Sequence, residues 1–198
     1  QFSRRNVEGQ EEVIPNNTPP KNGNRVKARY RLFQVLNKVN LSAKLEIERF
    51  LRSDEVTEIS QETAVQITAN RPIFDENLRE ICSTDSRELA KNLSGLKSKK
   101  HSQKALIAEQ PAPAALSIPD DVCHYDESTL RTLSVREQAR IQSFPDWFVF
   151  RSKVTTGGKL RSLEVPQYTQ VGNAVPPLLG NSLGIITKNI LEIAEIQS

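Results

Sequence analysis

Three closely spaced prolines interrupt regular structure in the middle of this chain. Pro111, Pro113 and Pro119 follow a lysine-rich stretch, and a proline biases the residue before it away from the helical conformation. We therefore expect residues 97–119 to form a basic loop that leads into an extended segment. Regular structure should resume only near Leu133.

Helical periodicity precedes the prolines. Helices are expected from Arg25, after Ser42, after Ser60 and from Asp85 to about Leu96. The first carries apolar residues at spacings of three and four, which places them on one face: Val26, Tyr30, Phe33 and Leu36. At the start of the last, Asp85 and Glu88 match a capping box.

Two more helices are expected after the prolines. Ser134 and Glu137 match a capping box at the start of one, and Pro145 should end it. The other begins at Pro177 and should be about 30 Å long. Its apolar face consists of Leu179, Leu183, Ile186, Ile190 and Ile193. Between the two, residues 155–158 are predicted to be a mobile turn and residues 163–165 a short strand.

The first 24 residues have few apolar anchors and are rich in Asn, Pro and Gly near their end, which predicts a flexible linker. The chain begins with Gln and contains no Met, so we expect it to be an internal fragment of a longer protein.

Several classes of protein are excluded by what the sequence lacks. No apolar run approaches the roughly 18 to 20 residues that span a bilayer, and the first residues do not have the pattern of a secretion signal. Cys82 and Cys123 are too few for a disulfide framework or a zinc site, so no metal is expected. The bacterial cytoplasm is the expected location.

The net charge of +3 is too small to indicate a nucleic-acid partner by itself. The charge is clustered, however, because the segment from Lys21 to Arg52 contains nine basic residues and two acidic ones. The stretch from Lys97 to Lys104 is a second basic cluster.

Two blocks near the end of the chain resemble the ninth and tenth sequence motifs of the DNA cytosine-5 methyltransferase family. Residues 131–148 read RTLSVREQARIQSFPDWF, close to the family form R-x-L-T-x-R-E-x-A-R-x-Q-x-F-P-D. Ser134 replaces the commoner Thr, and either hydroxyl can cap a helix. Residues 167–177 read QYTQVGNAVPP and are similar to Q-x-G-N-x-V-P-P. The order and separation of the blocks also agree.

The resemblance implies a mixed α/β (α+β) fragment. It would comprise a small recognition domain and the C-terminal helix of an S-adenosylmethionine-dependent methyltransferase fold, whose Rossmann-like sheet lies mostly outside this chain. The expected divisions are a linker at 1–24, a target-recognition domain at 25–165 and a segment at 166–198 that returns to the catalytic domain.

The resemblance also implies roles for individual residues. The scaffold residues would be Ser134, Arg136, Glu137, Arg140, Asp146, Gln170 and Gly172. The cofactor would contact Asn173, Ala174 and Val175. The candidate DNA contacts are Lys97, Lys99, Lys100, His101, Lys104 and Arg161. Two plainer interpretations stay open: the lysine-rich loop as solvated surface, and the tenth motif as a turn that starts a helix.

The family's nucleophilic cysteine lies in a Pro-Cys pair and its cofactor in a Gly-rich loop, and neither feature is found in this sequence. Cys82 and Cys123 have other neighbours, so no catalytic residue is assigned. We expect part of an enzyme that transfers a methyl group from S-adenosylmethionine to carbon 5 of cytosine in a specific DNA sequence, in restriction-modification. Its partners would be double-stranded DNA and the catalytic part, without which it should be inactive. The alternative is a stand-alone DNA-binding or interaction module derived from such an enzyme.

Overall fold

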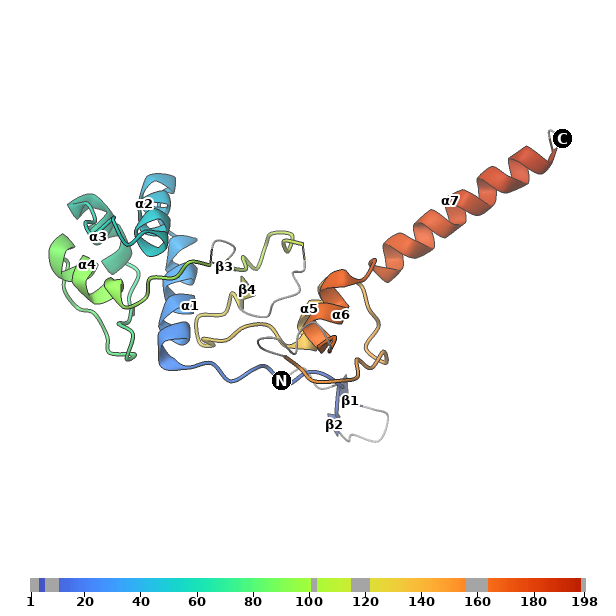
Figure 1. The fold of residues 1–198 in the computed structure, drawn as a ribbon, viewed down its shortest axis with the longest axis horizontal. Coiled ribbons are helices and arrows are strands. Elements are labelled where there is room, and N and C mark those ends of the chain that lie inside the picture. Colours follow the sequence, from blue (N-terminus) through green and yellow to red (C-terminus); the bar gives the residue numbers. More distant parts are fainter. Residues whose placement is uncertain (1–3, 6–10, 101–102, 115–121, 156–163, 197–198) are drawn as a thin grey trace. The chain divides into compact units, whose positions relative to one another are not determined.

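The computed structural model describes residues 4–5, 11–100, 103–114, 122–155 and 164–196. These residues form two compact units (Figure 1). The first, here called the helical unit, lies within residues 19–112 and 120–133. The second, here called the motif unit, lies within residues 1–18, 113–119 and 134–198. The chain is therefore mixed in structure, but its division differs from the expected one, because residues before position 19 belong with those after position 133.

The helical unit contains four helices and a small parallel sheet among its described residues. The helices are α1 (Asn24–Leu36), α2 (Leu41–Arg52), α3 (Gln61–Thr68) and α4 (Ser86–Ser94). The strands are β3 (Lys104–Ala105) and β4 (Val122–Cys123), with Lys104 paired to Val122 and Ala105 to Cys123. All four helices expected before the prolines are confirmed.

Side-chain caps explain where three of these helices begin. The side chains of Asn40, Ser60 and Asp85 accept hydrogen bonds from backbone amides in the first turn of α2, α3 and α4, where an amide has no carbonyl partner within the helix. At α2 the bond from the amide of Ala43 is 2.8 Å long. Hydrogen bonds also link α2 to the start of α3, because the carboxylate of Glu46 accepts from both the amide and the hydroxyl of Ser60.

One apolar core holds the helical unit together. The apolar side chains predicted to share one face of α1 lie in this core or against it, together with residues of α2, α3 and α4. Ile47, Ile67, Leu89 and Leu93 are all fully buried there. Because each such side chain contributes roughly 1.5–3 kcal/mol when removed from water, apolar burial dominates the stability of this unit.

The motif unit contains β1 (Arg4–Arg5), β2 (Glu11–Glu12), α5 (Val135–Ile141), α6 (Gln167–Asn173) and α7 (Pro177–Ile196). The two strands are antiparallel. Its core is small and lies between α5 and α6, where Val135, Ala139, Phe150, Tyr168 and Val171 meet. The terminal helix α7 confirms the element expected from Pro177.

Two expectations for the motif unit need correction, and a third falls mostly outside the described residues. The helix α5 ends at Ile141 rather than at Pro145, because Ser143 takes a left-handed φ of 62° that no helix continues through. Glu164 and Val165 are not in a strand, while Leu163 lies outside the described residues. Of the turn expected at 155–158, only Thr155 is described. Among the described residues, none of the helices combines the length and apolar character required to cross a membrane.

Candidate functional site

The helix α5 of the ninth motif begins with a complete capping box. The amide of Glu137 donates to the hydroxyl of Ser134 at 3.1 Å, and the Glu137 carboxylate accepts from the Ser134 amide at 2.7 Å. The Ser134 hydroxyl also donates to the side chain of Asn17 at 3.0 Å. The cap therefore fixes both the helix and a segment far away in the sequence.

Arg136 is fully buried and acts as a hub for backbone carbonyls. Its guanidinium donates to the oxygens of Pro15 (3.0 Å), Pro145 (2.9 Å) and Phe148. Burial lowers the pKa of Arg136 from its ordinary value, yet a guanidinium stays charged at any physiological pH. Arg136 thus holds the chain on both sides of α5.

Arg140 and Asp146 close the turn that follows α5. Two parallel bonds of 2.8 Å join the guanidinium to the two carboxylate oxygens, the fork-to-fork arrangement that makes such pairs strong. These hydrogen bonds, which Arg140 donates to Asp146, raise the pKa of Arg140. The pair spans the point where the backbone leaves the helix at Ser143.

Residues 15–17 were interpreted from the sequence as part of a flexible linker, but they lie in the middle of the motif unit. The side-chain amide of Asn16 donates to the oxygen of Phe150 and to the side chain of Gln167, both at 2.9 Å. Its oxygen accepts from the Phe150 amide at 3.0 Å. Asn16 takes a left-handed φ of 63°, which Asn tolerates better than most residues. The residue type is the sign of this role that the sequence contains, because Asn tolerates a left-handed backbone and has a short side chain that can form hydrogen bonds.

The tenth motif is largely helical, which the sequence did not predict. Gln167 and Gln170 lie on α6 and donate to the backbone of the segment after α5: Gln167 to Ser152, and Gln170 to Arg151 and Val165, each at 2.8 Å. The ninth and tenth motifs are joined into one body by the side chain of Gln142, which donates to the oxygen of Val171 at 3.4 Å, and by the apolar core that α5 and α6 share. Gly172 is half-buried near the end of α6.

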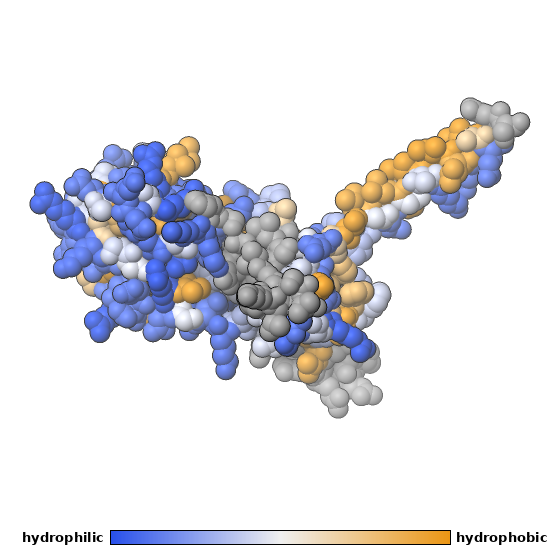
Figure 2. Space-filling view, viewed as in Figure 1, coloured by the Kyte–Doolittle hydropathy of each residue, from blue (hydrophilic) through white to orange (hydrophobic). Residues whose placement is uncertain are grey.

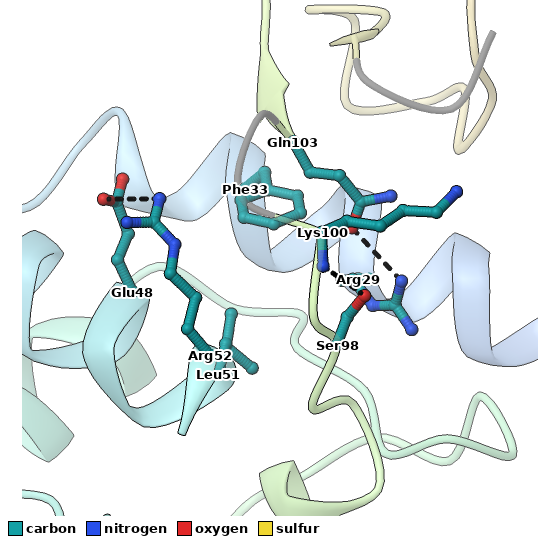
Figure 3. Close-up of a pocket in the computed structure, with 8 residues that line it drawn as sticks. All are labelled: Arg29, Phe33, Glu48, Leu51, Arg52, Ser98, Lys100 and Gln103. Atoms are coloured by element: carbon teal, nitrogen blue, oxygen red, sulfur yellow. Dashed lines mark hydrogen bonds and ion pairs between the residues drawn. The ribbon is translucent and has the colours of Figure 1, made fainter. Parts of the chain in front are cut away.

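The three candidate cofactor contacts follow one another at the end of α6. Asn173 and Val175 are exposed, and Ala174 begins an extended connection to α7. Neither of the two pockets described for this chain, one of which is drawn in Figure 3, is lined by them. This segment therefore presents an exposed edge at the end of α6.

The helix α7 presents its apolar face to solvent. The side chains predicted to share that face are all about half exposed or more, with Leu183 at 52% and Ile190 at 60%. Figure 2 shows the resulting hydrophobic strip along the helix. Monomeric proteins rarely expose a continuous apolar surface of this kind, so the face is a candidate interaction surface.

The basic loop of the helical unit starts from a rigid base. The guanidinium of Arg25 donates to the oxygen of Lys97 at 2.8 Å, and that of Arg29 to the oxygen of Leu96 at 3.0 Å. Ser98 is held from the other side, because its amide donates to the oxygen of Leu51, in the last turn of α2, at 2.8 Å. The first residues of the loop are thus fixed between α1 and α2.

Lys97 has a structural place in this arrangement, which the sequence did not predict. Its ammonium donates to the oxygens of Ser53 and Val56, both at 2.8 Å, and lies 4.7 Å from the centre of the Phe50 ring. These bonds satisfy carbonyls just after the end of α2. Its geometry is that of a packing residue and not of a free surface lysine.

The other candidate DNA contacts are placed unequally. Lys99, Lys100 and Lys104 are exposed, the last on β3. His101 and Arg161 lie outside the described residues. The loop therefore brings two lysines together at its beginning, and the third follows on the strand.

The two cysteines have different surroundings. Burial raises the pKa of the Cys123 thiol to about 12, so that the reactive thiolate is absent at neutral pH. Cys82 is exposed, and its backbone oxygen accepts a hydrogen bond from Arg71. Among the described residues, no cluster of His, Cys, Asp or Glu is arranged to hold a metal ion.

Comparisons with known proteins agree with the two motifs. A sequence model described as C-5 cytosine-specific DNA methylase matches residues 4–190. The Type II methyltransferase M.DdeI of Desulfomicrobium norvegicum is 53% identical over 53 residues, which are 27% of this chain and 12% of that protein. M.BsuRI of Bacillus subtilis is 44% identical over 57 residues, 29% of this chain and 13% of that protein. No solved structure matches.

Coverage differs widely among these relatives. The matched segments make up only 12%, 15% and 13% of M.DdeI, M.AplI and M.Bpa9945I. The Type II methyltransferase M.AquIB of Picosynechococcus sp. is 34% identical over 93 residues, which are 46% of this chain but 66% of that much shorter protein. Because the family match extends over nearly the whole sequence, the chain belongs to the C-5 cytosine-specific DNA methylase family.

Proposed function

We propose that this chain is the C-terminal part of a DNA cytosine-5 methyltransferase, and that it supplies DNA recognition and closes the cofactor pocket. The whole enzyme would transfer a methyl group to carbon 5 of cytosine in a specific sequence, as part of a restriction-modification system. The observation that carries this proposal is that the ninth and tenth motifs share one core and lie in one body, which ends in a helix with an uncovered apolar face.

The uncovered face of α7 supports a docking role toward the catalytic part. A helix of 20 residues with leucines and isoleucines exposed along one side gains stability only when another surface covers them. The motif unit also exposes Trp147, at 78%. A catalytic part, joined in cis or as a separate subunit, would bury these side chains.

The short relative M.AquIB supports the separate-subunit arrangement. A protein named as a Type II methyltransferase matches this chain over 66% of its own length, so a chain of this limited kind can carry that name. The longer relatives support the arrangement in cis, because only a small part of each matches.

The helical unit would face DNA through its basic loop. Its base is held by bonds from Arg25 and Arg29, so Lys99 and Lys100 project from a fixed platform. Prior fixation lowers the entropy lost on binding. Extruding a base from the duplex costs a few kcal/mol, and contacts of this kind would help to offset that cost.

Enzymes of this family use S-adenosylmethionine, which supplies the methyl group. In the proposed enzyme, Asn173, Ala174 and Val175 would form one edge of its pocket. Asn173 offers a donor and an acceptor, and the small Ala174 lets a ligand approach the backbone. Gln167 and Gln170 would hold that edge in place through their bonds to residues 151, 152 and 165.

The test combines this chain with a catalytic part that carries the Pro-Cys motif and the Gly-rich loop, and measures transfer of labelled methyl groups to duplex DNA. Neither part should be active alone, whereas the mixture should be. Replacing Leu183 by Glu should strongly reduce activity of the mixture, because a carboxylate would enter the docking face.

A matched control keeps the interpretation specific. Asn181→Glu introduces the same carboxylate on the polar side of α7 and should leave the activity of the mixture unchanged. Turnover by this chain alone would contradict the proposal. If the chain bound DNA by itself and the catalytic part changed neither this binding nor methyl transfer, the stand-alone binding module would be favoured instead.

A further inference from the structure

The turn after α5 ends the helix with a left-handed residue that is not glycine. The amide of Ser143 donates to the oxygen of Arg140 and the amide of Phe144 to the oxygen of Ala139, both at 2.9 Å, which is the hydrogen-bond pattern of a Schellman motif. Ser143 occupies the left-handed position of this motif, with a φ of 62°. Glycine is the usual residue there because it adopts such a backbone without steric cost. Serine is therefore less favourable than glycine at this position, and the turn alone does not require its hydroxyl.

The helix α7 begins without a capping side chain of its own. Pro176, which precedes it, has no polar side-chain atom, and Pro177, its first residue, has no amide hydrogen. The first amide hydrogen of the helix is that of Leu178, which donates to the hydroxyl of Ser143 at 3.1 Å. An N-cap side chain usually accepts from an amide at this second or at the third helical position. Ser143 thus replaces the missing cap of α7 from 35 positions away in the sequence.

The residue before Ser143 holds the neighbouring helix. The side-chain amide of Gln142 donates to the oxygen of Val171, in the last turn of α6, at 3.4 Å. Two consecutive residues of the ninth motif therefore hold the end of α6 and the start of α7. Residues 173–175, the candidate cofactor contacts, lie between these two points. Because both ends are held, the connection between the helices can take fewer conformations.

We propose that Ser143 is a positioning residue, whose hydroxyl fixes the start of α7 and so holds residues 173–175 in the arrangement that contacts the cofactor. The link to the cofactor rests on the proposed function, whereas the cap itself does not. Glycine at position 143 would form the turn but would leave the amide of Leu178 without this acceptor. An edge that is fixed before the cofactor binds loses less entropy on binding.

The first experiment measures how fast the amide hydrogen of Leu178 exchanges with water, by nuclear magnetic resonance on the full chain. Ser143→Ala and Ser143→Gly both remove the hydroxyl, so exchange should become about 5-fold faster in each, in keeping with the usual strength of an N-cap. Ser143→Gly should still unfold at a higher temperature than Ser143→Ala, because glycine tolerates the left-handed backbone. Exchange at the wild-type rate in both variants would overturn the proposal.

Ser152→Gly is the matched control for this measurement. Ser152 is exposed and also has a left-handed φ, of 82°, and its side chain forms no hydrogen bond with the residues that the structure describes. Glycine at this position should relieve the backbone and leave exchange at Leu178 unchanged. If the control also accelerated exchange at Leu178, the rate would report a general loosening of the motif unit, and the assignment to the Ser143 hydroxyl would be overturned.

The second experiment measures methyl transfer by this chain together with the catalytic part. Ser143→Gly should raise the KM for S-adenosylmethionine about 3-fold and change kcat less, because the hydroxyl acts on the cofactor edge and not on the reacting atoms. A role in the turn alone would leave the KM of this variant unchanged, and that result would overturn the link to the cofactor. If the wild-type mixture were inactive, the proposed function would fail, and exchange at Leu178 would still decide whether Ser143 caps α7.

Discussion

The helical unit and the motif unit are stabilised in different ways. The helical unit buries side chains from all four of its described helices in one apolar core. The motif unit has a small core of five fully or nearly fully buried residues, and hydrogen bonds from Asn16, Arg136 and Gln167 connect its segments. Its longest helix, α7, adds little to that core because its apolar face is exposed.

This difference indicates which unit depends on another molecule. A core of many buried aliphatic residues can stabilise a domain by itself. The free energy gained by burying only a few residues, in contrast, rarely exceeds the entropic cost of folding. The motif unit should therefore be the less stable one in isolation and should gain most when a partner covers α7. The following substitutions test the contrast, from the largest expected effect to the smallest.

The largest effect is expected from Arg136→Met. The change removes three bonds to backbone carbonyls and leaves those carbonyls buried, which should cost at least about 4.5 kcal/mol, given roughly 1.5–3 kcal/mol per bond to a charged group. Hydrogen exchange measured by mass spectrometry should rise throughout residues 134–150 but stay unchanged in α1 to α4. Loss of protection in both units would show that they fold together and would remove the contrast.

The reciprocal change is Ile47→Ala in the helical unit. Ile47 is fully buried, and truncation of such a residue to Ala typically costs 2–5 kcal/mol, so about 3 kcal/mol is expected. Exchange should rise in α1 to α4 and stay unchanged in α5 and α6. Leu45→Ala on the same helix is the control, because Leu45 is 52% exposed and should change the unfolding free energy much less.

Local patterns were sufficient to predict most of the helices. The capping box of Ser134 and Glu137 and the apolar periodicity of α1 and α7 involve residues within a few turns of one another, and the structure has all three elements. The end of α5 was wrong, because the left-handed φ of Ser143 overrides the stop signal at Pro145. Such a backbone reversal has no strong signature when the residue is not glycine.

Contacts between distant residues could not be predicted in the same way. Asn16 and Phe150 are 134 positions apart, and no periodicity joins them. Lys97 looked like a surface lysine because it stands in a lysine-rich run, yet its ammonium binds carbonyls after α2 that are adjacent only in the folded chain. The sequence motifs indicated the family. Only the folded structure shows that Lys97 in the lysine-rich segment is a packing residue, whereas Lys99 is exposed.

Asn16→Ala tests whether residues 15–17 belong to the motif unit. It removes three hydrogen bonds of a partly buried amide, so about 2 kcal/mol should be lost from that unit. Urea unfolding followed by the fluorescence of Trp147, the single tryptophan of the chain, reports on this unit alone. Asn22→Ala, in the helical unit, should leave that transition unchanged. A silent Asn16→Ala would restore the linker interpretation.

Ser134→Ala should have a smaller effect of about 1 kcal/mol, the usual value of an N-cap. Ser134→Thr retains the hydroxyl and should recover most of the stability, as the commoner residue of the family motif would. The same fluorescence transition measures both variants. If Thr and Ala were equally destabilising, crowding around this buried position would outweigh the cap.

The smallest effect concerns acid stability of the helical unit. Glu127, in the segment after β4, pairs with Arg31 of α1 at 2.9 Å and with Lys38, which lies just beyond the end of that helix. The hydrogen bond from Lys38, together with the charge of Arg31, lowers the pKa of Glu127 below its ordinary value of 4.5. A lowered folded-state pKa means that the stabilisation is complete above pH 4.5 and is lost as the pH falls through the folded-state value.

Glu127→Gln should therefore reduce stability slightly at pH 7 and flatten its dependence on pH below about 4.5. The effect is small because the Glu127 side chain is 41% exposed, and solvent screens its charge. Thermal unfolding followed by far-ultraviolet circular dichroism from acidic to neutral pH measures it, and Glu58→Gln at an exposed position serves as the control. If Glu127→Gln and wild type lost stability in parallel on acidification, the ion pair with Arg31 and Lys38 would not contribute to the acid stability of the helical unit. The stability of the helical unit at acidic pH would then depend on its apolar core alone. That outcome would sharpen its contrast with the motif unit, whose segments are connected by hydrogen bonds.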